Sequence, residues 1–121
     1  MNCIDLRIPQ GRAPLAIKHG FVSMLAQALE ASGTAYAWLR CSLLDEADIV
    51  GLPVYDSEGD CVRLNPTWIQ KLQREAPKRC VVMLDEFDQV NNDDVKRALL
   101  RLVESGADEL PANTTFIRIL G

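Results

Sequence analysis

Two neighbouring carboxylates, Asp85 and Glu86, directly follow a run of apolar residues in the stretch "VVMLDEF", residues 81 to 87. Such an apolar run is typical of a strand that is buried on both faces of a parallel sheet. Carboxylates at the end of that strand can hold a magnesium ion through water and orient a water molecule for attack on a phosphate. The same pair can also serve only as solvated groups that end the strand and help to cap the next helix. The pair alone favours neither interpretation, so the rest of the chain has to decide between them.

The segments around this strand alternate between strand-like and helical patterns. Residues 3–8 alternate apolar and polar side chains before a turn at Pro9 and Gly11, which predicts a first strand. Ser57-Glu58-Gly59-Asp60 lies between two short extended runs and predicts a small hairpin. Further strands are expected at 35–40, 81–84 and 114–120, and helices at 15–31, 66–75 and 93–104, where apolar residues recur at helical spacing. A cap for the last helix is expected at Asn92 or Asp93.

Alternation of strands and helices predicts an α/β fold with a mostly parallel sheet. We expect a three-layer open sheet with helices on both faces, plus the small hairpin, in a single domain that spans residues 1–121. The apolar run at 81–84 should be a central strand, since only a strand with neighbours on both sides is buried in this way.

Composition excludes several classes of function. The formal charge of −4 argues against a nucleic-acid surface, because phosphate neutralisation needs clustered Lys and Arg. No segment reaches the roughly 20 apolar residues of a membrane helix, and no secretory signal is present, so a cytoplasmic location is expected. The cysteines form no Cys-x-x-Cys pair and indicate no metal site, and each is expected to be a buried free thiol. They are Cys3, Cys41, Cys61 and Cys80.

Three stretches resemble the AAA+ ATPases, and within them the MoxR-like group. These are "LLDEADIVGLPV", "NPTWIQKL" and "VVMLDEFDQVNNDDVKRALLRLVESG", which are similar to that group's loop and hairpin, its following helix, and its Walker B strand with the next helix. The resemblance implies a P-loop NTPase fold. It also implies that Asp85 matches the Walker B aspartate, which holds magnesium through water, and that Glu86 matches the glutamate that polarises the attacking water.

The phosphate-binding loop of that family needs Gly-x-x-x-x-Gly-Lys-Ser/Thr, because the backbone must wrap the phosphates with positive-φ turns. If Lys18 is the matching lysine, Arg12 and Ile17 stand where the two glycines are required, and His19 stands where the hydroxyl ligand of magnesium is required. A β-branched residue such as Ile17 is costly at a position that needs glycine. We therefore predict that the chain binds no nucleotide and uses no cofactor, and that Asp85 and Glu86 are vestigial.

The C-terminal part lacks further members of the family's machinery. The strand "TTFIRILG" is similar to the one that leads to the residue sensing the γ-phosphate, but the chain stops at Gly121 before such a residue. Neither Arg101 nor Arg118 occupies the position of an arginine finger, and both are expected on an exposed face.

These patterns predict a catalytically inactive, AAA+-like protein-interaction module. It would act as an adaptor, decoy or inhibitor, by analogy with a phage-encoded antagonist of a host machine. The expected partner is a protein, such as a host AAA+ ring or a defence complex, and neither nucleic acid nor membrane. The alternative is a fragment or subunit of an ATP-hydrolysing MoxR-like ATPase.

The contact surface is expected on the segment 45–64, which is acidic and also carries apolar residues. Its six carboxylates stand against a single arginine, Arg63. Tyr55 is the candidate aromatic anchor, and Glu58 and Asp60 are the candidate charged contacts. The alternative is a solvated hairpin whose apolar side covers the domain's own core.

Overall fold

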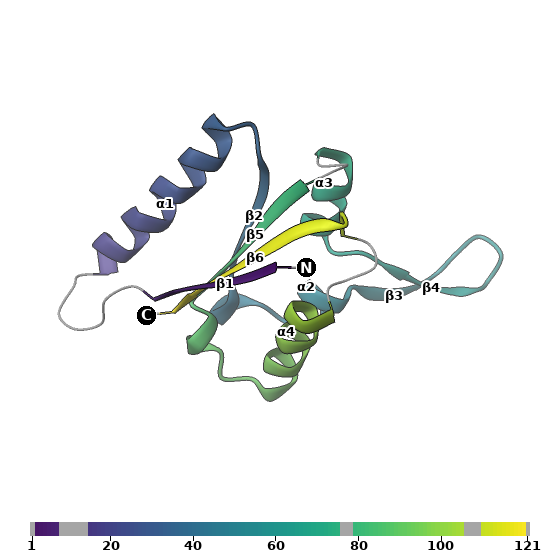
Figure 1. Ribbon diagram of the computed structural model, residues 1–121. Helices are drawn as coiled ribbons and strands as arrows, with labels where there is room; N and C mark the ends of the chain where they lie inside the picture. The colour runs from purple at the N-terminus through teal and green to yellow at the C-terminus, as the bar shows by residue number, and fades with distance from the viewer. Residues whose placement is uncertain (1, 8–14, 76–78, 106–109, 121) are drawn as a thin grey trace.

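The computed structural model describes residues 2–7, 15–75, 79–105 and 110–120 (Figure 1). Its strands are β1 (Asn2–Arg7), β2 (Ala35–Arg40), β3 (Leu52–Tyr55), β4 (Cys61–Leu64), β5 (Arg79–Asp85) and β6 (Asn113–Leu120). Its helices are α1 (Leu15–Ala31), α2 (Ala47–Val50), α3 (Thr67–Glu75) and α4 (Asp93–Ser105), with short 3₁₀ turns at Cys41–Leu43 and Phe87–Gln89. The predicted strands and helices are all found, and among the described residues their ends differ from the prediction by at most two residues. The predicted end of the first strand at Ile8 and the turn at Pro9 and Gly11 lie outside the described residues.

Four strands form a parallel sheet in the order β1-β6-β5-β2, and β3 and β4 form a separate antiparallel pair. The prediction of an α/β fold with a mostly parallel sheet is therefore confirmed. Strand β5 lies between β6 and β2, so the backbone groups along the apolar run at 81–84 pair on both sides. This confirms the central position predicted from its continuous apolar sequence.

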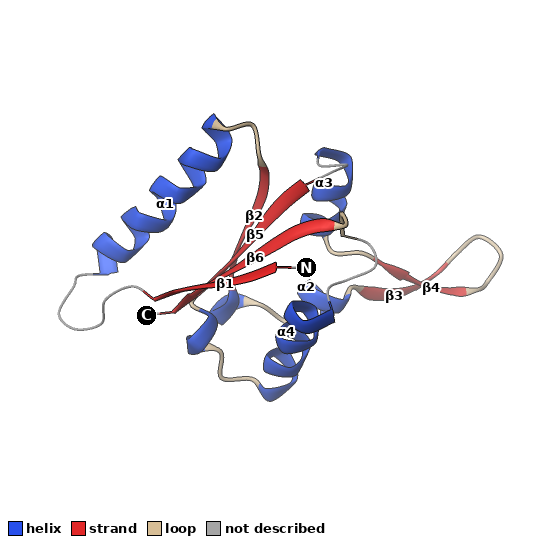
Figure 2. Cartoon of the chain, in the orientation of Figure 1, coloured by secondary structure: helices blue, strands red, loops and turns tan. Residues whose placement is uncertain are grey.

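Helices cover both faces of the sheet, which gives three layers (Figure 2). On one face Val22 and Ala26 of α1 are buried in a cluster with Val81, Met83 and Ile117 of the sheet. On the other face α2, α3 and α4 bury their apolar stripes against β2, β5 and β6. The connection through α1 runs from the β1 edge to the β2 edge, and α3 and α4 lead back. Right-handed crossovers in opposite directions place helices on opposite faces.

Short-range interactions determine where α4 begins and where β3 begins. The Oδ1 atom of Asn92 accepts the backbone N–H groups of Asp94 and Val95, at 2.9 and 3.2 Å, so Asn92 is the residue that caps α4. Gly51 follows α2 with a φ of 83°, and a Cβ there would lie 2.3 Å from the carbonyl oxygen of Leu64. Only glycine therefore allows β3 to begin this close to the end of β4.

Two of the four cysteines differ from the prediction of buried thiols. Cys41 and Cys80 are buried, but Cys3 and Cys61 are exposed, and all four are free. Among the described strands, β1, which carries Cys3, lies at the edge of the four-stranded sheet, and Cys61 lies on the two-stranded hairpin, so neither strand is enclosed as β5 is. Among the residues that the structure describes, no helix is long and apolar enough to cross a membrane.

Candidate functional site

The Asp85 carboxylate lies at the carboxyl edge of the sheet, where open α/β sheets bind their ligands. Asp85 is the last residue of β5 and is only 9% exposed. Its Oδ2 atom accepts the indole N–H of Trp38 at 3.0 Å, and its Oδ1 atom accepts the backbone N–H of Glu86 at 2.9 Å. Both carboxylate oxygens are thus engaged by donors of the chain itself.

Glu86 has an unusual backbone conformation. Its φ of 55° and ψ of 36° are left-handed, and it is the one non-glycine residue with positive φ in the described ranges. That region costs a residue with a side chain on the order of 1 kcal/mol or more and is frequent at functional sites. The Glu86 carboxylate accepts a hydrogen bond from the hydroxyl of Ser42, which follows β2. The carboxylate of Asp85 is therefore bound to β2 itself, and that of Glu86 to the 3₁₀ turn that follows β2.

Cys41 shows the electrostatic character of this edge. Burial raises the pKa of its thiol from 9.0 to about 12, and the nearby carboxylates of Asp85 and Glu86 add to the increase. The thiol is thus held in its neutral form, which is the form that is neither a good nucleophile nor a metal ligand. Ser42, Trp38 and Cys41 were not among the predicted site residues, because they precede Asp85 by more than forty positions in the sequence.

The residues matched to a phosphate-binding loop fall at the start of α1. Ile17, Lys18 and His19 lie in its first turns, while Arg12 lies outside the described residues. A helical Ile17 has none of the positive-φ geometry that a glycine supplies in a phosphate loop. Within the part of the chain that is described, no three His, Cys, Asp or Glu side chains are grouped so as to hold a metal ion.

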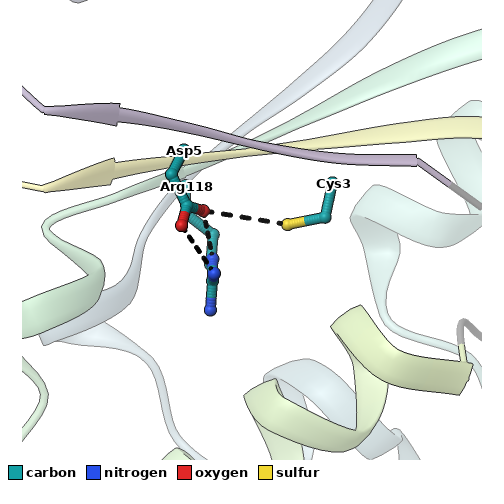
Figure 3. A network of polar contacts seen from close by, with 3 residues as sticks. All are labelled: Cys3, Asp5 and Arg118. Carbon is teal, nitrogen blue, oxygen red and sulfur yellow. Dashed lines mark hydrogen bonds and ion pairs between the residues drawn. The ribbon is translucent and has the colours of Figure 1, made fainter.

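Arg118 is not the freely exposed cation that the sequence predicted. Its Nε and Nη2 atoms donate to the two carboxylate oxygens of Asp5 at 2.6 and 2.8 Å, as Figure 3 shows. Its guanidinium also lies 5.2 Å from the ring centroid of Phe87. Asp5 and Arg118 are direct neighbours in the β1–β6 register. The pair joins the edge strand β1 to β6. Of the two arginines that were expected to be exposed, Arg101 is exposed.

The hairpin of β3 and β4 projects away from the sheet (Figure 1). Its tip is held by Asp56, whose Oδ1 atom accepts the backbone N–H groups of Glu58 and Asp60, each at 2.9 Å. Gly59 has a φ of 82° and completes the turn. Asp56 is therefore structural, whereas the Glu58 and Asp60 side chains are exposed and make no hydrogen bond or ion pair within the part of the chain that the structure describes.

Apolar side chains on the hairpin are left uncovered by the domain. Tyr55 is 79% exposed, and Leu52, Val62 and Leu64 are each exposed to about half. The interpretation in which the hairpin simply covers the core does not fit these four side chains. Two of them, Leu52 and Leu64, line a groove of about 480 Å³ at the base of the hairpin, which Trp68 and other residues of α3 also line.

The base of the hairpin is firmly tied to the domain. Arg63 donates from Nη1 to the carbonyl oxygen of Val50 at 3.0 Å, and Trp68 donates from Nε1 to the carbonyl oxygen of Asp48 at 2.6 Å. Arg63, the single basic residue of the segment 45–64, is thereby directed to the base and away from the acidic tip. The tip keeps a net negative charge.

No protein-family model matches this chain, and no curated protein matches it. Two regions therefore carry any inference about function, namely the carboxylates at the end of β5 and the hairpin of β3 and β4.

Proposed function

We propose that the chain is a protein-binding module that contacts a basic surface of its partner through the β3–β4 hairpin. The observation that carries this proposal is the exposure of Tyr55 beside the free carboxylates of Glu58 and Asp60 on a projecting hairpin. Exposed aromatic residues are frequent anchors of protein interfaces, and unpaired charges around them direct the approach of an oppositely charged partner.

The groove at the base of the hairpin supports the same proposal. Leu52, Leu64 and Trp68 line it together with Lys71 and Asp48, so it combines apolar and charged side chains. This composition suits a partner side chain that is apolar and is flanked by polar groups. An isolated hairpin with exposed apolar residues on both strands is costly in water, and binding would offset that cost.

We infer further that the domain is a catalytically inactive, AAA+-like core. The hairpin precedes the strand-end carboxylates in the chain, which is the order that the resemblance to MoxR-like ATPases implies. The position of Asp85 supports inactivity, because a carboxylate whose two oxygens accept protein N–H groups is poorly placed to orient the water ligands of magnesium. A host AAA+ ring or a defence complex remains the proposed kind of partner.

Calorimetry with ATP and magnesium tests the inactive character of the core. We expect no binding, because Arg12, Ile17 and His19 replace the residues that a phosphate loop needs. Titration of the Glu86→Gln variant under the same conditions is the control and should give the same baseline. Binding in the micromolar range would reverse the assignment.

ATP hydrolysis within a larger assembly is the second candidate, as for a fragment or subunit of a MoxR-like ATPase. One observation favours it: Glu86 combines a left-handed backbone with a position at the carboxyl edge of the sheet. Turnover of ATP that disappears in Glu86→Gln would establish this candidate in place of the first.

The hairpin contact is tested on the purified complex with the partner. Tyr55→Ala should weaken the affinity through faster dissociation, since it removes the proposed anchor. Combined Glu58→Lys and Asp60→Lys should slow association, with an effect that shrinks as salt is added. Circular dichroism should match the parent in both variants, and unchanged affinity in both would exclude the hairpin from the interface.

A further inference from the structure

The register of the β3–β4 hairpin decides which of its backbone groups face outward. The N–H of Asp56 donates to the carbonyl oxygen of Asp60 at 3.0 Å, so these two residues form a hydrogen-bonded pair beside the turn. Hydrogen-bonded and non-bonded pairs alternate along an antiparallel ladder. The next pair, Tyr55 and Cys61, is therefore non-bonded, and its N–H and C=O groups point away from the hairpin.

The two edges of the hairpin differ in what they offer to another strand. The pair of Pro53 and Arg63 is non-bonded by the same alternation, and proline fits there because it has no N–H to give to the ladder. Proline on an outer edge also hinders the addition of a further strand. The edge of β3 is thus blocked at Pro53, whereas the edge of β4 keeps the outward N–H and C=O groups of Cys61 and Arg63.

The edge of β4 is open within the part of the chain that the structure describes. All four residues of β4 are exposed, and among the described strands it pairs with β3 alone. No described residue forms a backbone hydrogen bond with the outward groups of Cys61 or Arg63. The Arg63 side chain, whose charge could protect the edge, is directed to the carbonyl oxygen of Val50 instead.

An edge of the larger sheet is built differently. Strand β1 carries the charged side chains of Asp5 and Arg7, and Asp5 forms an ion pair with Arg118 of the neighbouring strand. Charged side chains on an edge strand oppose pairing with a further strand. Strand β4 instead carries exposed Val62 and Leu64, so its edge lacks the protection that β1 and β3 have.

On the basis of the function proposed above, we propose that an extended basic segment of the partner pairs with the outer edge of β4 as a third strand. This pairing rests on the proposed function, because it specifies how the hairpin binds. The outward groups of Cys61 and Arg63 would bond to the main chain of the segment, which is the general mode of strand addition. A two-stranded hairpin is marginally stable in water, and a third strand would stabilise it.

The side chains of the hairpin indicate which segment fits. Alternate residues of a strand share a face, and one face of the hairpin holds Leu52, Val54, Val62 and Leu64. Val62 and Leu64 are 44% and 50% exposed. Aliphatic residues at alternate positions of the added strand would lie beside these two side chains and continue the apolar face.

Charge favours a basic segment over a second copy of the chain. The segment 45–64 carries six carboxylates and one arginine, and the carboxylates of Glu58 and Asp60 are exposed at the tip. Lysine or arginine in the added strand would be attracted to them. A second copy has the same formal charge of −4 and would bring the same acidic segment to the contact.

Hydrogen exchange of the full chain tests the pairing without any substitution. The probe is a short labelled peptide in which valine and lysine alternate, and fluorescence anisotropy measures its binding. In the free chain the amides of Cys61 and Arg63 should exchange faster than those of Val54 and Val62, which bond within the hairpin. The peptide should slow exchange at Cys61 and Arg63 most. A parent that does not bind the peptide, or unchanged exchange at these two amides in the complex, would overturn the proposal.

A proline substitution on β4 provides a second test. Cys61→Pro removes an outward N–H but changes neither the charge nor a hydrogen bond within the hairpin, and Cys61→Ala is the control that keeps the N–H. We expect Cys61→Pro to bind the peptide about tenfold more weakly, while Cys61→Ala binds like the parent. Circular dichroism and slow exchange at Val54 and Val62 check that the hairpin is formed. Equal affinities of the two folded variants would overturn the pairing.

The variants also separate this pairing from the proposed function. Peptide binding that is weakened by Tyr55→Ala or by Glu58→Lys with Asp60→Lys, but not by Cys61→Pro, would leave the hairpin contact in place and overturn the strand addition. Binding that none of these variants weakens would contradict both. Sedimentation equilibrium of the parent should show a single chain, and self-association that Cys61→Pro abolishes would make a second copy the occupant and overturn the proposal.

Discussion

Trp38 and Asp85 are joined by a hydrogen bond of 3.0 Å from the indole Nε1–H to Oδ2, which links β2 to the end of β5. The two residues are 47 positions apart in the sequence. With the backbone N–H of Glu86 on the other oxygen, this bond satisfies a carboxylate that is almost completely buried. The Asp85 carboxylate thus joins the end of β5 to β2 through its own hydrogen bonds.

Removal of the indole donor should destabilise the protein. Trp38→Phe leaves one oxygen of the buried Asp85 carboxylate without its donor, at a cost of about 1–3 kcal/mol in the free energy of unfolding. Urea unfolding measures this loss. Tyr36→Phe is the control, because the Tyr36 hydroxyl donates to the exposed Glu30, where water can replace it, and its effect should stay below about 1 kcal/mol. Equal losses in both variants would contradict a structural role for Asp85.

The raised pKa of the Cys41 thiol predicts how the free energy of unfolding changes at alkaline pH. Burial, with the carboxylates of Asp85 and Glu86, raises the pKa of the folded-state thiol from 9.0 to about 12. The stabilising contribution is therefore complete below 9.0 and is lost as the pH rises from there toward 12, because the unfolded chain loses its proton first. The difference in unfolding free energy between the parent and Cys41→Ala should shrink by up to about 1.4 kcal/mol per pH unit in this window. A pH-independent difference would show that the Cys41 thiol titrates normally.

The Asp5–Arg118 pair predicts an acid-side effect of the opposite sign. The bidentate hydrogen bond from Arg118 lowers the pKa of Asp5 below its ordinary 3.8, although partial burial opposes the shift. Its contribution is present above 3.8 and is lost as the pH falls through the lower folded-state pKa. Carboxyl NMR of Asp5 should show this lowered pKa, and Arg118→Gln should return it toward the ordinary value. Because the pair is partly exposed, the loss of stability should stay within about 1 kcal/mol.

Short-range signals in the sequence predicted the elements well. The turn Ser57-Glu58-Gly59-Asp60 predicted the hairpin, since Gly59 supplies the positive φ that the turn needs. The apolar run at 81–84 predicted the central strand, because only enclosure on both faces accounts for such a run. These features depend on neighbours in the chain, which the sequence displays directly.

Features that depend on which strands are neighbours in the sheet could not be predicted from the sequence. The Asp5–Arg118 pair follows from the β1–β6 register across 113 positions, so Arg118 was wrongly expected to be simply exposed. Cys3 was wrongly expected to be buried, because residue types within β1 do not reveal that it is an edge strand. The left-handed backbone of Glu86 also has no local signal, since glutamate rarely adopts it.

The most direct test of contact rather than catalysis is a quantitative capture of partners from the native host with three forms of the tagged protein. The forms are the parent, the hairpin variant with Tyr55→Ala, Glu58→Lys and Asp60→Lys, and the edge variant with Asp85→Asn and Glu86→Gln. We expect the same partner with the parent and the folded edge variant, and its loss with the folded hairpin variant. Retention by the hairpin variant together with loss in the edge variant would contradict the account and make the β5 carboxylates the functional centre.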